Sequence, residues 1–246
     1  MPVIKAILFD LGDTLLDFGP INTTGLFARG ARLAYRYLQR LGFHMPPFRD
    51  YHRRRLWAIR WHYVKSRITQ REFDSLGLLA GMERSMGHLL TPEQTEELAW
   101  QWYRPLGRCA SVEEGLHGVL DGFRKDGLSL GIVSNTFVPG EVLDRHLAEL
   151  RLLEYLPLRV YSCDVRYRKP HARIFQIALD RLAIRAAEAV FVGDSLFADV
   201  AGARRVGMIS VLKDPTGAKK HRRIRPNHRV TCLKELPRIV ASYDGA

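Results

Sequence analysis

Two aspartates stand where buried strands of this chain should end, and their positions could support phosphoryl transfer. Asp10 follows the apolar run "VIKAILF" (3–9), and Asp194 follows "AVFVG" (189–193). A carboxylate held at a strand end could attack phosphorus and form an aspartyl-phosphate. Because a carboxylate and a phosphate dianion repel each other, such a site needs cations. Asp10 and Asp194 could together hold one Mg²⁺, which prefers hard oxygen ligands.

Four further polar residues should lie near the strand ends that carry Asp10 and Asp194. Lys169 could stabilise negative charge on Asp10 and on the transferring group. Ser134 could donate a hydrogen bond to a phosphate oxygen, with backbone N–H groups near Asn135 assisting. Asp199 comes about one helical turn after Asp194, where it could orient Lys169 or a metal-bound water.

Strand and helix patterns alternate over most of the chain, which predicts an α/β fold with a Rossmann-like parallel sheet. Apolar runs typical of buried strands are 3–9, 128–133, 189–193 and 208–212, with a weaker one at 158–163. Helical patterns lie between them, at 113–127, 140–156, 171–184 and 197–207. In such sheets ligands bind at the carboxyl ends of the strands, so the polar residues at those ends should meet.

Residues 18–106 differ from the rest because their pattern is helical throughout. The segment "TTGLFARGARLAYRYLQRLG" is amphipathic, and Thr91 with Pro92 has the signature of a helix start. We therefore predict a catalytic core formed by residues 1–17 and 107–246, with an all-helical cap inserted at 18–106.

Four motifs occur in order along the chain: "FDLGDTLL" (9–16), "GIVSNT" (131–136), "RKP" (168–170) and "VGDSLFAD" (192–199). Together they resemble the haloacid dehalogenase superfamily of hydrolases, in the branch with a helical cap after the first motif. The resemblance covers nearly the whole chain. It implies a Mg²⁺-dependent phosphatase that acts on a small phosphorylated metabolite through Asp10. It also implies that the backbone carbonyl of Gly12, two residues after the nucleophile, is a metal ligand.

Gly12 is also where the sequence departs from the family. Phosphatases of this superfamily usually carry a second aspartate there, which protonates the leaving oxygen. Glycine cannot do this, and losing a general acid typically costs ~10²–10⁴ in rate. Asp13, a residue of the cap or water could replace it. Thr14 is either a hydroxyl near the site or a turn residue.

Three other functions are alternatives. A dehalogenase is disfavoured because the resemblance implies that such members lack the "GD" of the intact fourth motif. A phosphonate-cleaving member would need a lysine in the cap, where Lys65 is the only one. The last alternative is a weakly active relative that binds a phosphorylated ligand or regulates a partner.

The chain carries a formal charge of +12, and only 8 of its 38 basic residues are lysine. We interpret the basic runs 52–67 and 219–229 as solvated faces, because no nucleic-acid-binding signature accompanies them. Trp57 and Trp61 are four residues apart, which places them on one helical face and favours packing in the core.

The remaining sequence features favour a cytoplasmic protein. Three widely spaced cysteines indicate unpaired thiols rather than a disulfide framework or a zinc site. We find no signal peptide and no apolar run of ~18 residues, so we expect no membrane partner. The sequence has no pattern that indicates an oligomeric state.

Overall fold

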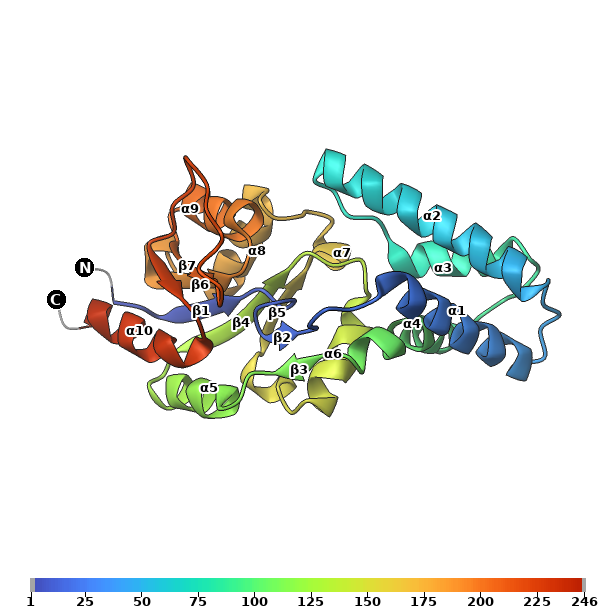
Figure 1. Ribbon diagram of the computed structural model, residues 1–246, viewed down its shortest axis with the longest axis horizontal. Helices are drawn as coiled ribbons and strands as arrows, with labels where there is room; N and C mark the ends of the chain where they lie inside the picture. The colour runs from blue at the N-terminus through green and yellow to red at the C-terminus, as the bar shows by residue number, and fades with distance from the viewer. Residues whose placement is uncertain (1–2, 245–246) are drawn as a thin grey trace.

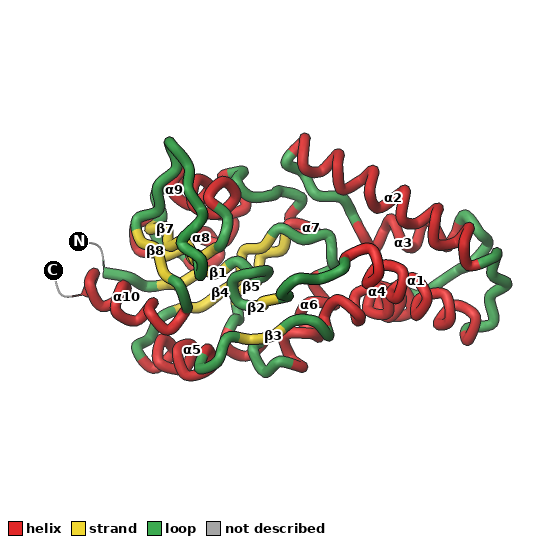
Figure 2. The backbone as a smooth tube through the Cα atoms, viewed as in Figure 1, coloured by secondary structure: helices red, strands yellow, loops and turns green. Residues whose placement is uncertain are grey.

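A computed structural model describes residues 3–244, and a parallel six-stranded sheet lies at its centre (Figures 1 and 2). The strand order is β5–β4–β1–β6–β7–β8. These strands are β1 (Ala6–Phe9), β4 (Ser129–Ser134), β5 (Leu158–Tyr161), β6 (Ala189–Gly193), β7 (Ile209–Lys213) and β8 (His228–Val230). Every strand predicted from an apolar run forms, and β8 extends one edge of the sheet.

Helices cover both faces of this sheet. They are α5 (Leu116–Lys125), α6 (Gly140–Glu149), α7 (Ser162–Val165), α8 (Ala172–Leu182), α9 (Ala201–Val206) and α10 (Leu236–Asp244). In β1, Ile7 and Phe9 join the buried cluster that includes α5, α6 and α10. Leu8 points the other way, into the cluster with α8 and α9. Since both faces of β1 are buried, its sequence is continuously apolar.

Four helices stand apart from the sheet at one end of the molecule (Figure 1). They are α1 (Thr23–Arg40), α2 (Phe48–Thr69), α3 (Ser75–Arg84) and α4 (Pro92–Gly107). Thr91 caps α4 in a capping box with Gln94, as the sequence predicts. Helix α1 approaches α4 so closely that a Cβ on Gly30 would lie 2.2 Å from the Trp102 carbonyl oxygen. Glycine therefore permits this packing.

A two-stranded antiparallel ribbon connects these helices to the sheet. It consists of β2 (Leu16–Asp17) and β3 (Ser111–Val112). The Ser111 hydroxyl donates a hydrogen bond of 3.2 Å to the Asp17 carbonyl. The chain therefore leaves the sheet region and returns to it at one place.

The prediction that Trp57 and Trp61 pack in the core is wrong. They are 70% and 59% exposed, and their rings stack on each other with centroids 6.2 Å apart. Helix α2 buries a different face, where Tyr51 and Arg55 lie. Spacing of four residues predicts a shared face, but it does not determine whether that face points inward.

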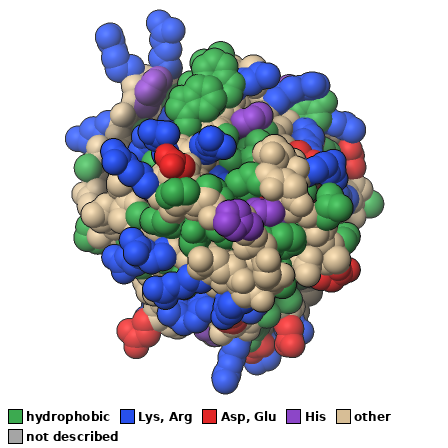
Figure 3. Space-filling model, turned by 90° about the vertical axis from the view of Figure 1, so that its right-hand side faces the viewer, with side chains coloured by type: hydrophobic (Ala, Val, Ile, Leu, Met, Phe, Trp, Pro, Cys, Tyr) green, Lys and Arg blue, Asp and Glu red, His purple; other side chains and the backbone are tan. Residues whose placement is uncertain are grey.

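Many basic side chains lie on the surface at the helical end (Figure 3). Figure 3 looks onto this end, where Lys and Arg side chains outnumber Asp and Glu. Within residues 3–244, no helix is both long enough and apolar enough to cross a membrane.

Candidate active site

The ends of three adjacent strands bring the predicted chemical groups together. Strand β1 pairs with β4 on one side and β6 on the other, so Asp10, Ser134 and Asp194 come to one edge. The Asp10 N–H donates a hydrogen bond of 2.8 Å to the Val192 carbonyl, which continues the strand pairing to the aspartate. This edge is also where the strand order reverses direction around β1.

Lys169 connects two of the carboxylates. Its Nζ lies 2.8 Å from Asp10 Oδ1 and 2.7 Å from Asp199 Oδ1, and its side chain is 1% exposed. Asn135 fixes the backbone of this lysine: its amide donates to the Lys169 carbonyl at 2.9 Å. In return, the Lys169 N–H donates to Asn135 Oδ1 at 2.7 Å. A buried ammonium is therefore held between two carboxylates.

Burial and the attraction between opposite charges both shift the pKa values of Lys169 and Asp199. Burial opposes the charged form of Lys169, but the Asp10 and Asp199 carboxylates raise the pKa of its amine above the ordinary value. Burial raises the pKa of Asp199 to about 6, against the attraction of Lys169. The two carboxylates therefore favour the charged form of Lys169, which could stabilise negative charge nearby.

Asp199 is positioned by a turn that needs a glycine beside it. A π-helical turn (Leu196–Val200) carries Asp199, whose Oδ2 accepts a hydrogen bond of 2.8 Å from the Ser195 N–H. A Cβ on Gly193 would lie 2.4 Å from Asp199 Cγ. The glycine of the fourth motif thus makes room for the carboxylate that reaches Lys169.

The same region offers oxygen donors for a cation. One carboxylate oxygen from each of Asp10, Asp194 and Asp199 lies within 4.8 Å of the others. Lys169 and the Leu11 N–H contact Oδ1 of Asp10, which leaves Oδ2 outside these contacts. Hard carboxylate oxygens suit a divalent cation such as Mg²⁺. Since both oxygens of Asp199 already contact Lys169 and the Ser195 N–H, Asp10 and Asp194 are the better ligands.

Gly12, Asp13 and Thr14, which follow Asp10 closely in the sequence, differ in burial and in their contacts. A Cβ on Gly12 would meet only Phe18 Cε2, at 3.9 Å, so there is space for a side chain. Asp13 is exposed and has a φ of 55°. Partial burial and the nearby Asp194 charge raise its pKa. Thr14 is fully buried, and its carbonyl accepts a hydrogen bond of 2.8 Å from Lys213 Nζ.

Ser134 ends β4 with only 4% of its surface exposed, at the sheet edge where it was expected. Lys65, the lysine considered for phosphonate cleavage, is exposed on α2. The thiols of Cys109, Cys163 and Cys232 are free, as predicted.

Lys219 is a site residue that the sequence reasoning missed. Its Nζ donates hydrogen bonds to the carbonyl oxygen of Asp194 at 2.6 Å and to its Oδ2 at 2.9 Å. The sequence places Lys219 in a basic run that we interpreted as a solvated face. Only the folding of the loop after β7 brings it to the sheet edge, and no local pattern predicts that contact.

Known proteins resemble this chain over most of its length. A family model described as haloacid dehalogenase-like hydrolase matches residues 4–207. A ribulose-1,5-bisphosphate 5-phosphatase from Halopiger xanaduensis is 30% identical, covering 86% of this chain and 85% of that protein. A phosphoserine phosphatase from Thermus thermophilus is 27% identical, covering 95% and 98%. The crystal structure of a HAD phosphatase from Thermococcus onnurineus superposes with a TM-score of 0.61 at 27% identity, covering 96% and 98%.

Proposed function

Because the chain belongs to the haloacid dehalogenase-like hydrolases, we propose that it is a Mg²⁺-dependent phosphatase that acts on small phosphorylated metabolites through Asp10. The observation that carries this proposal is the group formed by Asp10, Lys169 and Asp199, with Asp194 beside it. The phosphatase names of two relatives, which match 86% and 95% of the chain, support the reaction class. Their substrates differ, so they support a phosphate monoester rather than one particular compound.

In the proposed reaction the Asp10 carboxylate forms a bond to phosphorus while the phosphorus–oxygen bond of the ester breaks. The leaving oxygen departs with the bonding electron pair and must receive a proton. Water then attacks the aspartyl-phosphate, which releases inorganic phosphate and a proton and restores the Asp10 carboxylate. The Lys169 ammonium balances negative charge on both the nucleophile and the phosphoryl oxygens.

The donor set fits Mg²⁺. Carboxylate oxygens of Asp10 and Asp194 and the backbone carbonyl of Gly12 would hold the ion, which would neutralise charge on the phosphoryl group when bound. Ser134 and the backbone near Asn135 would donate hydrogen bonds to phosphoryl oxygens. Residues 18–106 would serve as the cap that covers this edge, and the rest of the chain would be the catalytic core.

An activated aryl phosphate provides the most direct test, because its leaving oxygen needs little protonation and the absence of an acid at Gly12 matters less. We expect turnover that requires Mg²⁺ and is abolished in Asp10→Asn, a nearly isosteric variant that lacks the nucleophilic carboxylate. Turnover that persists in Asp10→Asn would disprove the proposed nucleophile. Binding of Mg²⁺ and phosphate without any turnover would instead favour the binding or regulatory role.

A further inference from the structure

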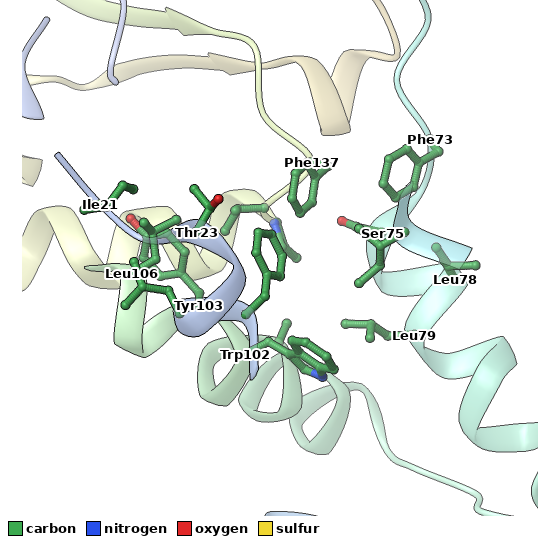
Figure 4. A pocket seen from close by; sticks show the side chains of 16 residues that line it. Ile21, Thr23, Phe73, Ser75, Leu78, Leu79, Trp102, Tyr103, Leu106 and Phe137 are labelled. Atoms are coloured by element: carbon green, nitrogen blue, oxygen red, sulfur yellow. The ribbon is translucent and has the colours of Figure 1, made fainter. Parts of the chain in front are cut away.

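An apolar cavity lies between the helical end of the molecule and the loop that follows β4 (Figure 4). Its volume is about 140 Å³. Residues of α1, α3 and α4 form most of its wall, among them Leu26, Leu79, Ala99 and Trp102. Phe137 lines it on the sheet side, facing the aromatic ring of Phe73 in Figure 4.

Among residues 3–244 no charged side chain lines this cavity, although Lys and Arg side chains are common on the surface at this end of the molecule (Figure 3). The lining hydroxyls are few. Thr23 is exposed, Ser75 is buried, and the Tyr103 hydroxyl is paired with His146 Nδ1 at 2.8 Å. An occupant of the cavity would therefore be uncharged and largely apolar, because a polar group would lose its hydrogen bonds to water there.

The cavity is close to the catalytic edge. Phe137 comes three residues after Ser134, so their Cα atoms are at most about 11 Å apart. Strands β4 and β1 are neighbours, which brings Asp10 to within about one strand spacing of β4. A small ester with its phosphorus at Asp10 could thus extend its organic part toward Phe137.

The aromatic surroundings of Phe137 support this connection. Its ring lies 6.5 Å from Phe27, 6.0 Å from Tyr63 and 5.9 Å from Phe73, measured between centroids. These three partners come from the helical end, whereas Phe137 continues the segment that carries Ser134 and Asn135. One side of the cavity wall, at Phe137, therefore continues directly from the segment proposed to bind phosphate.

We propose that this cavity binds the apolar alcohol portion of the phosphate monoester that the site hydrolyses. The proposal rests on the function proposed above, since it assumes that the phosphoryl group lies at Asp10. A dry cavity of ~150 Å³ lined by Leu, Ile and Phe can hold a benzene ring, so the occupant has about the size of one six-carbon group. The substrate class is an alkyl or arylalkyl phosphate.

A series of n-alkylphosphonates, from ethyl to octyl, tests the proposal with a readout independent of turnover. Their carbon–phosphorus bond is not cleaved by this reaction, and their Kd is measurable by calorimetry in the presence of Mg²⁺. We expect Kd to fall about fourfold per methylene once the chain reaches the cavity, and to level off when the cavity is full. A Kd that stays constant along the series would overturn the proposal.

Two cavity variants and one control test where the alkyl chain binds. Ala99→Leu fills the cavity from α4 and should flatten the dependence of Kd on chain length, with a melting temperature that reports folding. Ala241→Leu makes the same change at an exposed position of α10 and should keep the wild-type dependence. Phe137→Ala enlarges the cavity and should move the plateau to longer chains. Wild-type behaviour of both cavity variants would overturn the proposal.

Aryl phosphate turnover separates this result from the proposed function. Turnover combined with a flat phosphonate series would overturn only the assignment of the cavity. A rising affinity along the series without turnover would support the cavity as a ligand site and overturn the phosphatase.

Discussion

Gly12 leaves space beside Asp10 that a side chain could fill. Its backbone is outside the left-handed region, and the nearest obstacle to a Cβ is Phe18, at 3.9 Å. An aspartate here would carry a carboxyl group two residues after the proposed nucleophile, and its Cβ would make only an ordinary van der Waals contact with Phe18. No clash at the Cβ position therefore requires glycine here, and the missing carboxyl group follows from the residue type.

We expect Gly12→Asp to accelerate hydrolysis of alkyl phosphates by about 10²-fold or more, with a smaller effect on activated aryl phosphates. The difference arises because an alkoxide leaving group needs a proton and a phenolate with a low pKa does not. Steady-state kcat for the two substrate classes gives the comparison. Equal effects on both would show that proton donation does not limit the reaction.

Lys219 places a second cation at the proposed metal site. Its contact with Asp194 should weaken Mg²⁺ binding in two ways. The ammonium occupies a carboxylate oxygen that would be a metal ligand, and its charge repels the ion. We expect Lys219→Met to bind Mg²⁺ about two- to tenfold more tightly, as measured by calorimetry. Lys220→Met removes the same charge one residue further on, at an exposed position, and serves as the control. Equal gains in both variants would attribute the effect to net charge alone.

At the scale of elements, the pairing of His146 on α6 with Tyr103 on α4 joins the helical end to the sheet region. Burial lowers the pKa of His146 below its ordinary value. The unfolded chain therefore binds a proton more readily than the folded one, so acid weakens folding through this residue. The contribution is complete above pH ~6.5 and declines as pH falls toward the lowered pKa.

We expect the wild-type melting temperature to fall between pH ~7 and pH ~5 more steeply than that of His146→Gln, because each unit of pKa difference is worth about 1.4 kcal/mol. His52 and His228 are also shifted downward by burial, so part of the pH dependence should remain. His221→Gln, at an exposed position, is the matched control. If the melting temperature of His146→Gln depended on pH as steeply as that of the wild type, His146 would not be a source of the acid sensitivity.

The elements themselves were predictable where a strand is buried on both faces. The strands before Asp10 and Asp194 are buried over their whole length. Where each apolar run ends in the sequence, the position of the carboxylate at the end of the strand can be predicted. Trp57 and Trp61 show where this reasoning fails. Periodicity shows that two residues share a helix face, but whether that face is buried depends on the elements packed against the helix. Lys219 and Phe137 act through contacts between distant segments, and neither contact has a local signal.

At the scale of the whole molecule, the formal charge of +12 should attract anionic substrates over distances beyond direct contact. We expect kcat/KM for a phosphate ester to fall as NaCl rises from about 0.02 M to about 0.3 M, while kcat changes little, because salt screens the attraction before binding. Sucrose at matched osmolality is the control. A kcat/KM independent of salt would show that the basic surface does not assist substrate capture.

The ribbon of β2 and β3 has a consequence for how such a molecule can be rebuilt. Because Asp17 and Ser111 are partners across it, the ninety-odd residues between them begin and end side by side. A different helical segment with closely spaced ends could be spliced between these two positions without altering the register of the parallel sheet. The strand ends that carry Asp10, Ser134 and Asp194 would then keep their arrangement while the inserted helices changed the walls of the cavity, so this junction is a suitable place for testing whether the helical end sets substrate preference.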